Sequence, residues 1–297
     1  GETIEKYTGL QGLEPRLAMN YRINEKTSVK FSYNRNRQYI HLISNRTTPT
    51  PVDVWRPAGR YIEPATVDQI AAGWFRNFKE GMFKLSLESY YKNYQNLVDY
   101  KNGANLIFED NIETELLTGR GRAYGLELMF EKQVGVVTGW VSYTLSRSEL
   151  QVDKGATPRE WINDGNWYRA NYDKPHDISV VVTWRINKRW DVSTNFAYQT
   201  GRPMTPPESK AVFEGVIYPV TLERNSARIP DYHRLDLAAT YQLKSKPGRR
   251  WEHSLNFSVY NVYARKNAYS VFFRQNEDSG QPEAVRLSIF ATVIPSV

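Results

Sequence analysis

The 297-residue sequence contains no cysteine, which excludes a disulfide framework and a thiolate metal site. It also lacks any apolar run near 18 residues, so no transmembrane helix is expected. Lys and Arg total 39 against 32 for Asp and Glu, but they are scattered without a basic run, and no nucleic-acid partner is expected. The first ten residues, GETIEKYTGL, do not form a signal peptide, so any export signal is expected outside this sequence.

What the sequence does contain is alternation with a period of two, clearest between Tyr232 and Tyr263. One side of the first stretch carries His233, Leu235, Leu237, Ala239, Tyr241 and Leu243, and the intervening residues are mostly polar. After a basic Pro-Gly turn, Leu255, Phe257 and Val259 alternate with serine and asparagine. Side chains of a strand point alternately to opposite faces, so this stretch predicts a hairpin of two strands. Each is about ten residues long, which suits a tilted crossing of a bilayer.

The same pattern predicts eleven strands in all. They lie near Leu13–Arg22, Thr27–Ile40, Ala65–Phe78, Met82–Tyr100, Arg120–Lys132, Thr138–Ser148, His176–Ile186 and Trp190–Thr200, then in the Tyr232–Tyr263 hairpin, and last in AVRLSIFATV, residues 284–293. The tenth strand is expected to run on through ARKNAYSVFF, residues 264–273.

The connections between these strands alternate in length. Short turns such as INEK, KEG, NKR and SKPGRR follow the odd-numbered strands. Long polar segments, namely His41–Pro64, Lys101–Gly119, Glu149–Asp173 and Gly201–Asp231, follow the even-numbered ones. This asymmetry, together with 13% aromatic residues that suit interfacial girdles, predicts an all-β, antiparallel, up-and-down transmembrane β-barrel with short periplasmic turns and long extracellular loops.

An odd strand count does not close such a barrel, because bacterial single-chain barrels have an even number. The chain also ends on VIPSV without a terminal aromatic residue. Residues 1–297 are therefore expected to be the C-terminal portion of a larger barrel, an open half-barrel whose first and last strands do not pair. The isolated polypeptide is then expected to form no stable monomer in membranes, since its edges lack partners. A ladder between Leu17–Tyr21 and Val285–Ala291 would indicate a small closed barrel instead.

Several stretches resemble the TonB-dependent outer-membrane receptors, which are 22-stranded barrels closed by an N-terminal plug domain. They are PVDVWRPAG, SLESYYKNYQNLVDY, GRGRAYGLELMFEKQVGVVTGWVSYTLSRSE, YDKPHDISVVVTWRINKRW, YQTGRPMTPP, IPDYHRLDLAATY and SVYNVYARKNAYSVFF. The likeness extends to the branch with an additional carboxypeptidase-regulatory-like domain. It implies strands 12 to 22 of the barrel, with the plug, the TonB box and the signal peptide absent from this sequence.

The resemblance also implies a function: a receptor in the outer membrane of a Gram-negative bacterium takes up a siderophore, cobalamin, an oligosaccharide or a peptide, with energy supplied through the TonB protein. The expected partners are therefore outer-membrane lipid, TonB and the nutrient. Two alternatives stay open, a passive porin-like channel and a soluble β-rich ligand-binding or adhesion module.

No enzymatic site is expected, and no cofactor or metal. The four histidines have neither HExxH nor HxH spacing. His176 and His233 fall at the outer ends of strands, where bonds to the main chain or to carboxylates are expected. Gly119, Gly121 and Gly125 open a strand rather than a helix, which argues against a phosphate-binding loop. Among enzymes, an outer-membrane phospholipase-like barrel is the one type that would be compatible with the predicted fold.

The expected ligand contacts lie in two extracellular loops, where aromatic faces can stack on sugars and arginines can pair with carboxylates. They are Trp55, Arg56, Arg60 and Tyr61 in the first loop and Trp161, Trp167, Tyr168 and Arg169 in the third. The alternative is that these side chains pack the loops together. In the strands, Leu126, Leu128, Phe130, Ile178, Val180 and Val182 are expected to face lipid, and Glu127, Glu131, Ser179 and Thr183 the lumen.

Overall fold

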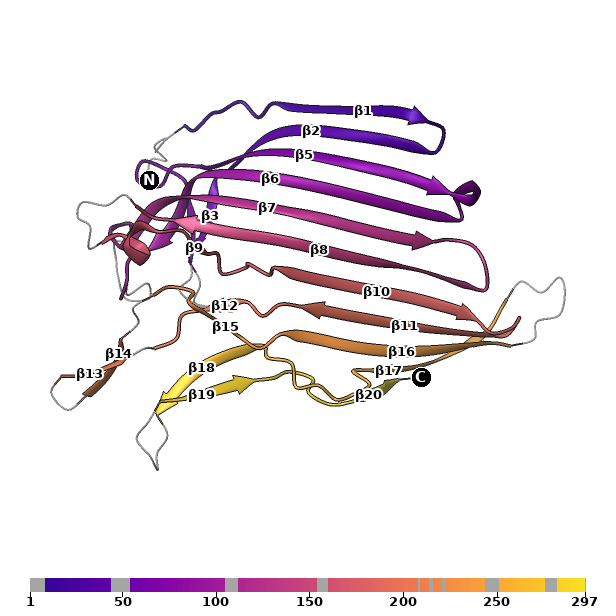
Figure 1. The fold of residues 1–297 in the computed structure, drawn as a ribbon. Helices are drawn as coiled ribbons and strands as arrows, with labels where there is room; N and C mark the ends of the chain where they lie inside the picture. Colours follow the sequence, from indigo (N-terminus) through magenta and orange to yellow (C-terminus); the bar gives the residue numbers. More distant parts are fainter. Residues whose placement is uncertain are drawn as a thin grey trace, which may run out of the picture.

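A single antiparallel sheet of 12 strands dominates the computed structural model and is curved but unclosed (Figure 1). The structure describes residues 9–43, 54–104, 112–153, 160–207, 209–213, 216–220, 223–243, 251–275 and 282–296. Within this part of the chain the fold is all-β, and the only helical segments are short 3₁₀ turns. No helix among these residues has the length and apolarity needed to cross a membrane.

The main sheet follows the order of the sequence, β1-β2-β5-β6-β7-β8-β10-β11-β16-β17-β20, with β9 paired to β8. Its strands are β1 Arg16–Asn24, β2 Thr27–Gln38, β5 Ala65–Phe78, β6 Phe83–Tyr100, β7 Leu116–Lys132, β8 Val137–Gln151, β9 Tyr168–Arg169, β10 His176–Arg185, β11 Trp190–Gln199, β16 Tyr232–Gln242, β17 Ser254–Tyr260 and β20 Ile294–Ser296. Apart from β9 and β20, each of these strands overlaps one that the alternation predicts.

The two edges of the sheet do not meet. Among the described residues, β1 pairs only with β2, and β20 pairs only with β17. No ladder joins Leu17–Tyr21 to Val285–Ala291, because residues 285–287 pair with another segment. The open sheet expected from the odd strand count is confirmed, and the small closed barrel has no support in the described part of the chain.

Short turns and long connections lie at opposite ends of the strands, as the sequence predicts (Figure 1). The turn end, on the right of the figure, holds the β1–β2 turn, the 3₁₀ turn η1 Lys79–Gly81 between β5 and β6, and residues 187–189 between β10 and β11. The predicted SKPGRR turn lies outside the described residues. The opposite end of the strands is called the loop end from here on.

The register gives the sheet two chemically distinct faces. One row of directly paired residues runs Phe130, Val141, Val180, Phe196, Leu235 across β7, β8, β10, β11 and β16. Positions of the opposite parity on these strands and on β6 give rows such as Glu88, Glu127, Thr144, Asp177 and Gln199. The first set defines the apolar face and the second the polar face. All ten residues assigned to faces from the sequence lie on the expected sides relative to one another, since their parity matches these rows.

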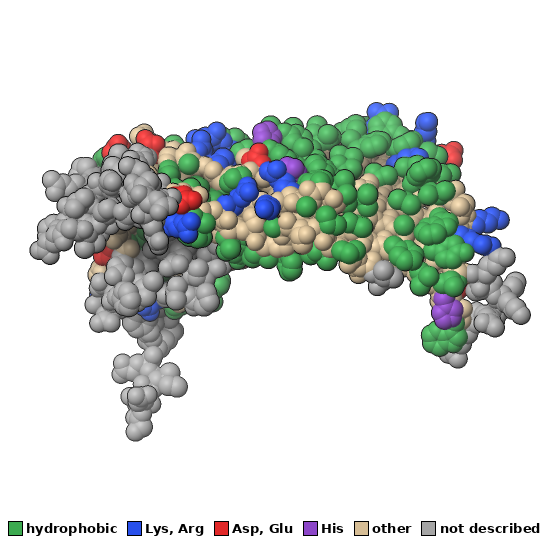
Figure 2. Space-filling view, turned by 90° about the horizontal axis from the view of Figure 1, so that it is seen from below, with side chains coloured by type: hydrophobic (Ala, Val, Ile, Leu, Met, Phe, Trp, Pro, Cys, Tyr) green, Lys and Arg blue, Asp and Glu red, His purple; other side chains and the backbone are tan. Residues whose placement is uncertain are grey.

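The apolar face is uncovered. Leu126, Leu128 and Phe130 are 44%, 40% and 42% exposed, although they lie in the middle of the sheet. Hydrophobic side chains cover much of the surface between the two ends (Figure 2). Soluble monomers rarely expose a contiguous apolar surface on this scale, so a protein of this kind needs an apolar environment around its strands.

The long connections contain structure that the alternation did not predict. The first of these connections is largely taken up by the hairpin of β3 Ile40–Ile43 and β4 Val54–Pro57. Residues 201–231 hold β12 Pro203–Met204 paired with β15 Ala227–Arg228, and β13 Ser209–Phe213 paired with β14 Val216–Val220. The alternation therefore missed these short hairpins within the long polar segments. Their ladders are too short for a period of two to stand out in the sequence.

The C-terminal strands also differ from the prediction. The tenth strand does not run on through residues 264–273, because β17 ends at Tyr260 and Asn261 turns the chain with a φ of 55°. The expected eleventh strand is not in the main sheet, since β19 Pro282–Leu287 pairs with β18 Ser270–Gln275 in a separate hairpin. The edge position belongs to β20, whose three residues come from the IPS of the VIPSV ending.

Asn261 supplies the physical reason for this correction. It is 1% exposed. Its side-chain Nδ2 donates to the carbonyls of Arg265 at 3.1 Å and Thr292 at 3.3 Å, and its main-chain N–H donates to Asp236 Oδ1 at 2.9 Å. These bonds end β17 and draw residues near Thr292 under it, so β20 follows beside β17.

Conventional hydrophobic cores occur at the loop end. One contains Leu117, Val152, Ile162 and Tyr168, and a second contains Ile43 and Ile112. Ile162 belongs to the 3₁₀ turn η4 Ile162–Gly165, and Ile112 to η2 Ile112–Glu115. The connections are therefore packed against each other and against the strand ends.

Candidate functional site

Arg224 joins three connections at the loop end. Its side chain is 6% exposed and forms an ion pair with Asp99, with Nη1 2.6 Å from Oδ1. The same nitrogen donates to the carbonyl of Tyr100 at 2.9 Å, and Nη2 donates to Asn102 Oδ1 at 2.8 Å. The guanidinium lies 4.0 Å from the centre of the Tyr100 ring. A buried guanidinium needs this complete set of partners, because an unpaired buried charge is costly.

Tyr168 completes the coordination of Asp99. Its hydroxyl donates to Asp99 Oδ2, and the residue is 4% exposed. Burial, followed by the Asp99 carboxylate, raises the pKa of Tyr168 above its ordinary value. Tyr168 therefore keeps its proton at neutral pH and acts as a hydrogen-bond donor that fixes β9 to the end of β6.

Asn163 and Asn225 link the connection after β8 to the connection after β11. The side-chain amide of Asn163 accepts from the main-chain N–H of Arg224 at 2.8 Å and donates to its carbonyl at 3.0 Å. Asn225 Nδ2 donates to the carbonyl of Arg169 at 2.6 Å and to Asn171 Oδ1 at 2.8 Å. Both asparagines have positive φ, near 50° and 57°, a conformation that asparagine tolerates better than most residues.

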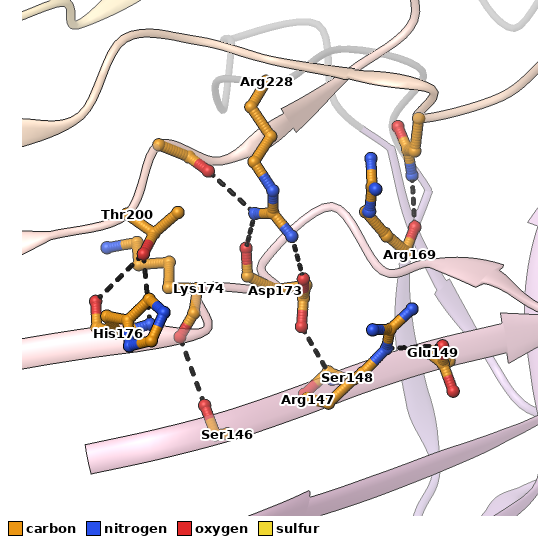
Figure 3. A network of polar contacts seen from close by, with 12 residues as sticks. Ser146, Arg147, Ser148, Glu149, Arg169, Asp173, Lys174, His176, Thr200 and Arg228 are labelled. Atoms are coloured by element: carbon orange, nitrogen blue, oxygen red, sulfur yellow. Dashed lines mark hydrogen bonds and ion pairs between the residues drawn. The ribbon is translucent and has the colours of Figure 1, made fainter.

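Asp173 and Arg228 form a second linkage between the same two connections (Figure 3). Asp173 Oδ2 pairs with Arg228 Nη2, and Asp173 Oδ1 accepts from the main-chain N–H of Ser148 at 2.7 Å. Arg228 Nη1 also donates to the carbonyls of Asp173 at 2.8 Å and Gly201 at 2.9 Å. The side chain of Asp173 is 1% exposed, so this pair is largely shielded from solvent.

Trp167 of the third loop lies against a cluster of charged side chains on β7 and β8. Glu149 accepts from Arg122 Nε and from Arg147 Nε, each at 2.7 Å. The guanidinium of Arg122 lies 4.2 Å from the ring of Trp167, which fits a cation–π contact. Trp167 is thus held over a charged pair at the loop end.

The residues predicted as ligand contacts in the first loop are mostly exposed. Trp55 and Tyr61 are 64% and 71% exposed, and Arg60 lies 6.0 Å from the Tyr61 ring. Arg56 pairs with His41 in the β3–β4 register and lies 3.9 Å from Glu113. Three of these four side chains are accessible for contact with a ligand.

The predicted residues of the third loop are more enclosed. Tyr168 is buried, and Trp161, Trp167 and Arg169 are half-buried. Arg169 Nη1 donates to the carbonyl of Ser226 at 3.0 Å, which ties it to the connection after β11. In this loop the observed contacts are with strand ends and with other connections. The ligand-binding role of all eight residues stays a prediction.

Described residues at the loop end line two hollows of note. One, of about 250 Å³, is lined by Lys174, Gln199, Arg202, Tyr232 and Tyr269 among others. Burial, followed by the neighbouring Arg202, lowers the pKa of Lys174. The other, of about 470 Å³, is lined by residues of β2, β3, β5 and β6 and by Tyr172. Neither contains any of the eight predicted ligand contacts.

The imidazole rings of the two histidines at strand ends bond to tyrosines, and not to the main chain or the carboxylates that the sequence suggested. His176 Nδ1 lies 2.9 Å from the Tyr143 hydroxyl, and His233 Nδ1 lies 2.8 Å from the Tyr263 hydroxyl. The main-chain N–H of His176 donates a hydrogen bond to the Thr200 hydroxyl, Oγ1 (Figure 3). Among the described residues, no group of three or more potential metal ligands comes together.

Sequence reasoning missed the residues that organise this end, namely Asp99, Asp173, Arg224, Asn225 and Arg228. Asp99 looks like an ordinary polar residue at the end of a predicted strand, and the other four look like ordinary polar loop residues. The Arg224–Asp99 pair is separated by 125 positions. The short run ERNSAR, residues 223–228, carries three of the five. Its density of polar groups just before a strand is the one available signal.

Comparison with known proteins identifies the architecture. The profile described as TonB dependent receptor-like, beta-barrel, matches residues 5–262. No curated protein matches. The ferric-catecholate import receptor Fiu from E. coli K12 superposes with a TM-score of 0.56 at 14% identity, covering 91% of this chain and 33% of that receptor.

Other solved receptors give the same picture. The ferripyoverdine receptor of Pseudomonas aeruginosa has a TM-score of 0.55 at 14% identity, covering 95% of this chain and 31% of the receptor. The FrpB iron transporter from Neisseria meningitidis has a TM-score of 0.53 at 14% identity, covering 91% and 37%. The chain therefore spans about a third of the length of these receptors. At such identities the likeness shows the fold alone.

Proposed function

Because the chain belongs to the TonB-dependent receptor family, through the β-barrel domain of those receptors, we propose that it is part of an outer-membrane receptor that imports a scarce nutrient with energy from TonB. The family is an outer-membrane family of transport receptors, not of enzymes. The observation that carries the proposal is the match of residues 5–262 to that barrel domain, together with an unclosed sheet that has one apolar face.

We further propose that residues 1–297 are the C-terminal portion of the barrel of such a receptor, whose plug domain and TonB box lie elsewhere in the protein. The number of strands in the main sheet supports this, since the eleven neighbouring strands of its path, without β9, are half of a 22-stranded barrel. The loop end then faces the outside of a Gram-negative cell and the turn end faces the periplasm.

The apolar face is proposed to contact outer-membrane lipid. Aromatic side chains mark both margins of this face. Trp190 and Tyr241 lie in contact near the turn end, with ring centres 4.9 Å apart, and Tyr198 and His233 are paired near the loop end. Trp190 and Tyr198 are eight steps apart, roughly 27 Å along a strand. At the usual tilt this gives about 20 Å of height, which is most of an outer-membrane apolar band of about 25 Å.

In this proposal the loops and the plug capture the nutrient, and TonB acts on the plug to open a path along the polar face. The neighbouring structures include receptors described as importing ferric catecholates and ferripyoverdine. A siderophore, cobalamin, an oligosaccharide and a peptide are all candidate nutrients for this chain. Trp55, Arg60 and Tyr61 are proposed as outer contacts, because they are exposed at the loop end.

Growth and uptake experiments on the full-length receptor test the proposal. A strain lacking the receptor is grown on a panel of single nutrient sources, and uptake of the nutrient it fails to use is measured with and without TonB. We expect uptake to require both the receptor and TonB. Uptake that continues in the absence of TonB would support a passive channel and reject the proposal.

A further inference from the structure

We propose that Arg76, Lys79 and Lys132, at the turn end of the apolar face, bind the headgroup of an anionic phospholipid in the periplasmic leaflet. These three residues are called the turn-end cations. The inference goes beyond nutrient uptake. It rests on the proposed function in one respect, the contact of the apolar face with membrane lipid.

The register brings the turn-end cations to one place. Phe78, Phe83 and Lys132 are paired in one row across β5, β6 and β7. Arg76 lies two positions before Phe78 on β5 and therefore on the same face. Lys79 follows directly after β5, in the 3₁₀ turn η1. Directly paired side chains begin about 5 Å apart, so long basic side chains from β5, η1 and β7 can reach a single headgroup.

Phenylalanine rings support two of the turn-end cations. The guanidinium carbon of Arg76 lies 5.0 Å from the centre of the Phe78 ring, and Lys79 Nζ lies 5.7 Å from the centre of the Phe83 ring. The Phe83 ring in turn stacks on Phe130, with ring centres 5.7 Å apart. A ring attracts a cation but leaves most of its N–H groups available for hydrogen bonds. The charges are therefore held at the margin of the apolar face and keep free donors.

None of the described carboxylates forms an ion pair with a turn-end cation. Glu80 lies in the same turn as Lys79, yet within the described part of the chain it pairs with none of the three. Lys132 Nζ lies over the β7–β8 connection, 3.4 Å from the position of a Cβ added at Gly135. A cluster of cations without a counter-charge from the chain favours an anion from outside it.

The loop end of the same face is built differently. Arg35 donates to Asp68 through Nε at 2.8 Å and through Nη2 at 2.9 Å. Arg122 and Arg147 share the carboxylate of Glu149. The chain thus supplies carboxylates to these cations at the loop end and supplies none to the turn-end cations. This difference favours an anionic headgroup at the turn end, which in the proposed orientation lies in the periplasmic leaflet.

A phospholipid fits this arrangement better than a soluble anion. Leu87 and Leu128, on the same face and further into the sheet, are 39% and 40% exposed and offer apolar surface to acyl chains. Arginine binds a phosphate through two parallel hydrogen bonds, and lysine binds it as a point charge. The apolar stems of both side chains can stay on the sheet while their charged ends reach the headgroup. Because basic residues near a membrane surface attract anionic lipids, a net negative headgroup is favoured over a zwitterionic one.

Native mass spectrometry of the purified, delipidated full-length receptor in detergent tests the inference. The lipid probes are phosphatidylglycerol and phosphatidylcholine with the same acyl chains, and glycerol 3-phosphate is the soluble phosphate probe. Binding of each probe is titrated to the unaltered receptor and to a cluster variant. The cluster variant combines Arg76→Gln, Lys79→Gln and Lys132→Gln.

A matched control removes the same charge from the same end of the strands at positions outside the cluster. It combines Lys26→Gln in the β1–β2 turn, Lys84→Gln on the polar face of β6, and Lys188→Gln between β10 and β11. Heat-modifiability on gels shows whether each variant is folded. If the cluster variant did not fold, Lys132→Gln alone would take its place, with an expected loss of about fivefold in phosphatidylglycerol affinity.

We expect phosphatidylglycerol to bind the unaltered receptor and the control at least tenfold more tightly than phosphatidylcholine, and the cluster variant to lose this preference. The inference is overturned if the two lipids bind alike, if the cluster variant keeps the preference, if the control also loses it, or if glycerol 3-phosphate binds as tightly as phosphatidylglycerol. Any of these results with uptake that still requires TonB would reject the lipid site alone. Uptake without TonB would reject the proposed function itself.

Discussion

The strands and the connections of this protein are stabilised in opposite ways. In the middle of the sheet the main-chain ladders are regular, and large apolar side chains such as Leu128 remain 40% exposed. At the loop end Val152 and Ile162 are fully buried, and ion pairs such as Arg224–Asp99 are shielded from water. The strands therefore depend on what surrounds the protein, whereas the connections carry their own core and their own polar partners.

Removing the central arginine should have the largest effect. We expect Arg224→Met, in the full-length receptor, to lower the free energy of local opening at the loop end by about 3–5 kcal/mol, because it leaves the buried Asp99 without its cationic partner. Hydrogen exchange of residues 99–102 and 162–171 measures this. Arg274→Met, which affects an exposed pair with Glu283, should change opening there by less than about 1 kcal/mol. Equal effects of the two variants would mean that burial does not distinguish the two regions.

A charge on the apolar face should have the next largest effect. We expect Val180→Arg to destabilise the folded receptor in lipid vesicles by about 2–4 kcal/mol, because the new charge lies near the bilayer midplane. Thr183→Arg, on the polar face of the same strand, should be tolerated. Heat-modifiability on gels gives the folded yield of each. The same yield for both variants would show that the faces are assigned incorrectly.

Asn261 lies where the two regions meet, and its replacement should have an intermediate effect. We expect Asn261→Ala to cost about 1–3 kcal/mol, because buried carbonyls near Arg265 and Thr292 lose their donor. The amides of β20 should then exchange faster than those of β16. Asn261→Gly, which accepts a positive φ without strain, separates the side-chain bonds from the backbone conformation. If glycine restored full protection of β20, the backbone conformation would be the whole cause.

The smallest effect expected is on pH dependence. The hydrogen bonds from the Tyr198 hydroxyl and the Gly201 N–H hold the pKa of Asp231 below its usual range. A lowered carboxyl pKa stabilises the fold at pH values above the ordinary carboxyl range. This stabilisation is lost as pH falls from that range through the lowered pKa of Asp231. Proteolysis of residues 201–231 should increase between about pH 5 and pH 3. Asp231→Asn should make proteolysis of this segment less dependent on pH. If the pH profile of the variant were unchanged, other carboxyl groups would be its cause.

The two regions also differ in how far the sequence predicts them. Alternation of residues such as Glu127 and Leu128 gives face and strand directly, because a strand repeats every two residues. It gives β5 with its observed bounds, Ala65–Phe78. Nothing local predicts that Arg224 reaches Asp99 or that Asn261 ends β17, because those outcomes depend on contacts between distant connections. The third-loop aromatics show the limit, since Tyr168 looks like a surface contact in sequence and is 4% exposed in the structure.

The pairing of strands in sequence order has a consequence for how such a sheet changes in evolution. From β1 to β11 the order of the strands in the main sheet is their order in the sequence, with β9 paired to β8 at the side of this path. The information that sets each register is therefore carried by adjacent hairpins, and contacts of this kind form at low loop-closure cost. Duplication or deletion of one hairpin, for example β10 His176–Arg185 with β11 Trp190–Gln199, would leave the other registers intact. A sheet of this kind can therefore change its number of strands in steps of two, while its connections diversify independently.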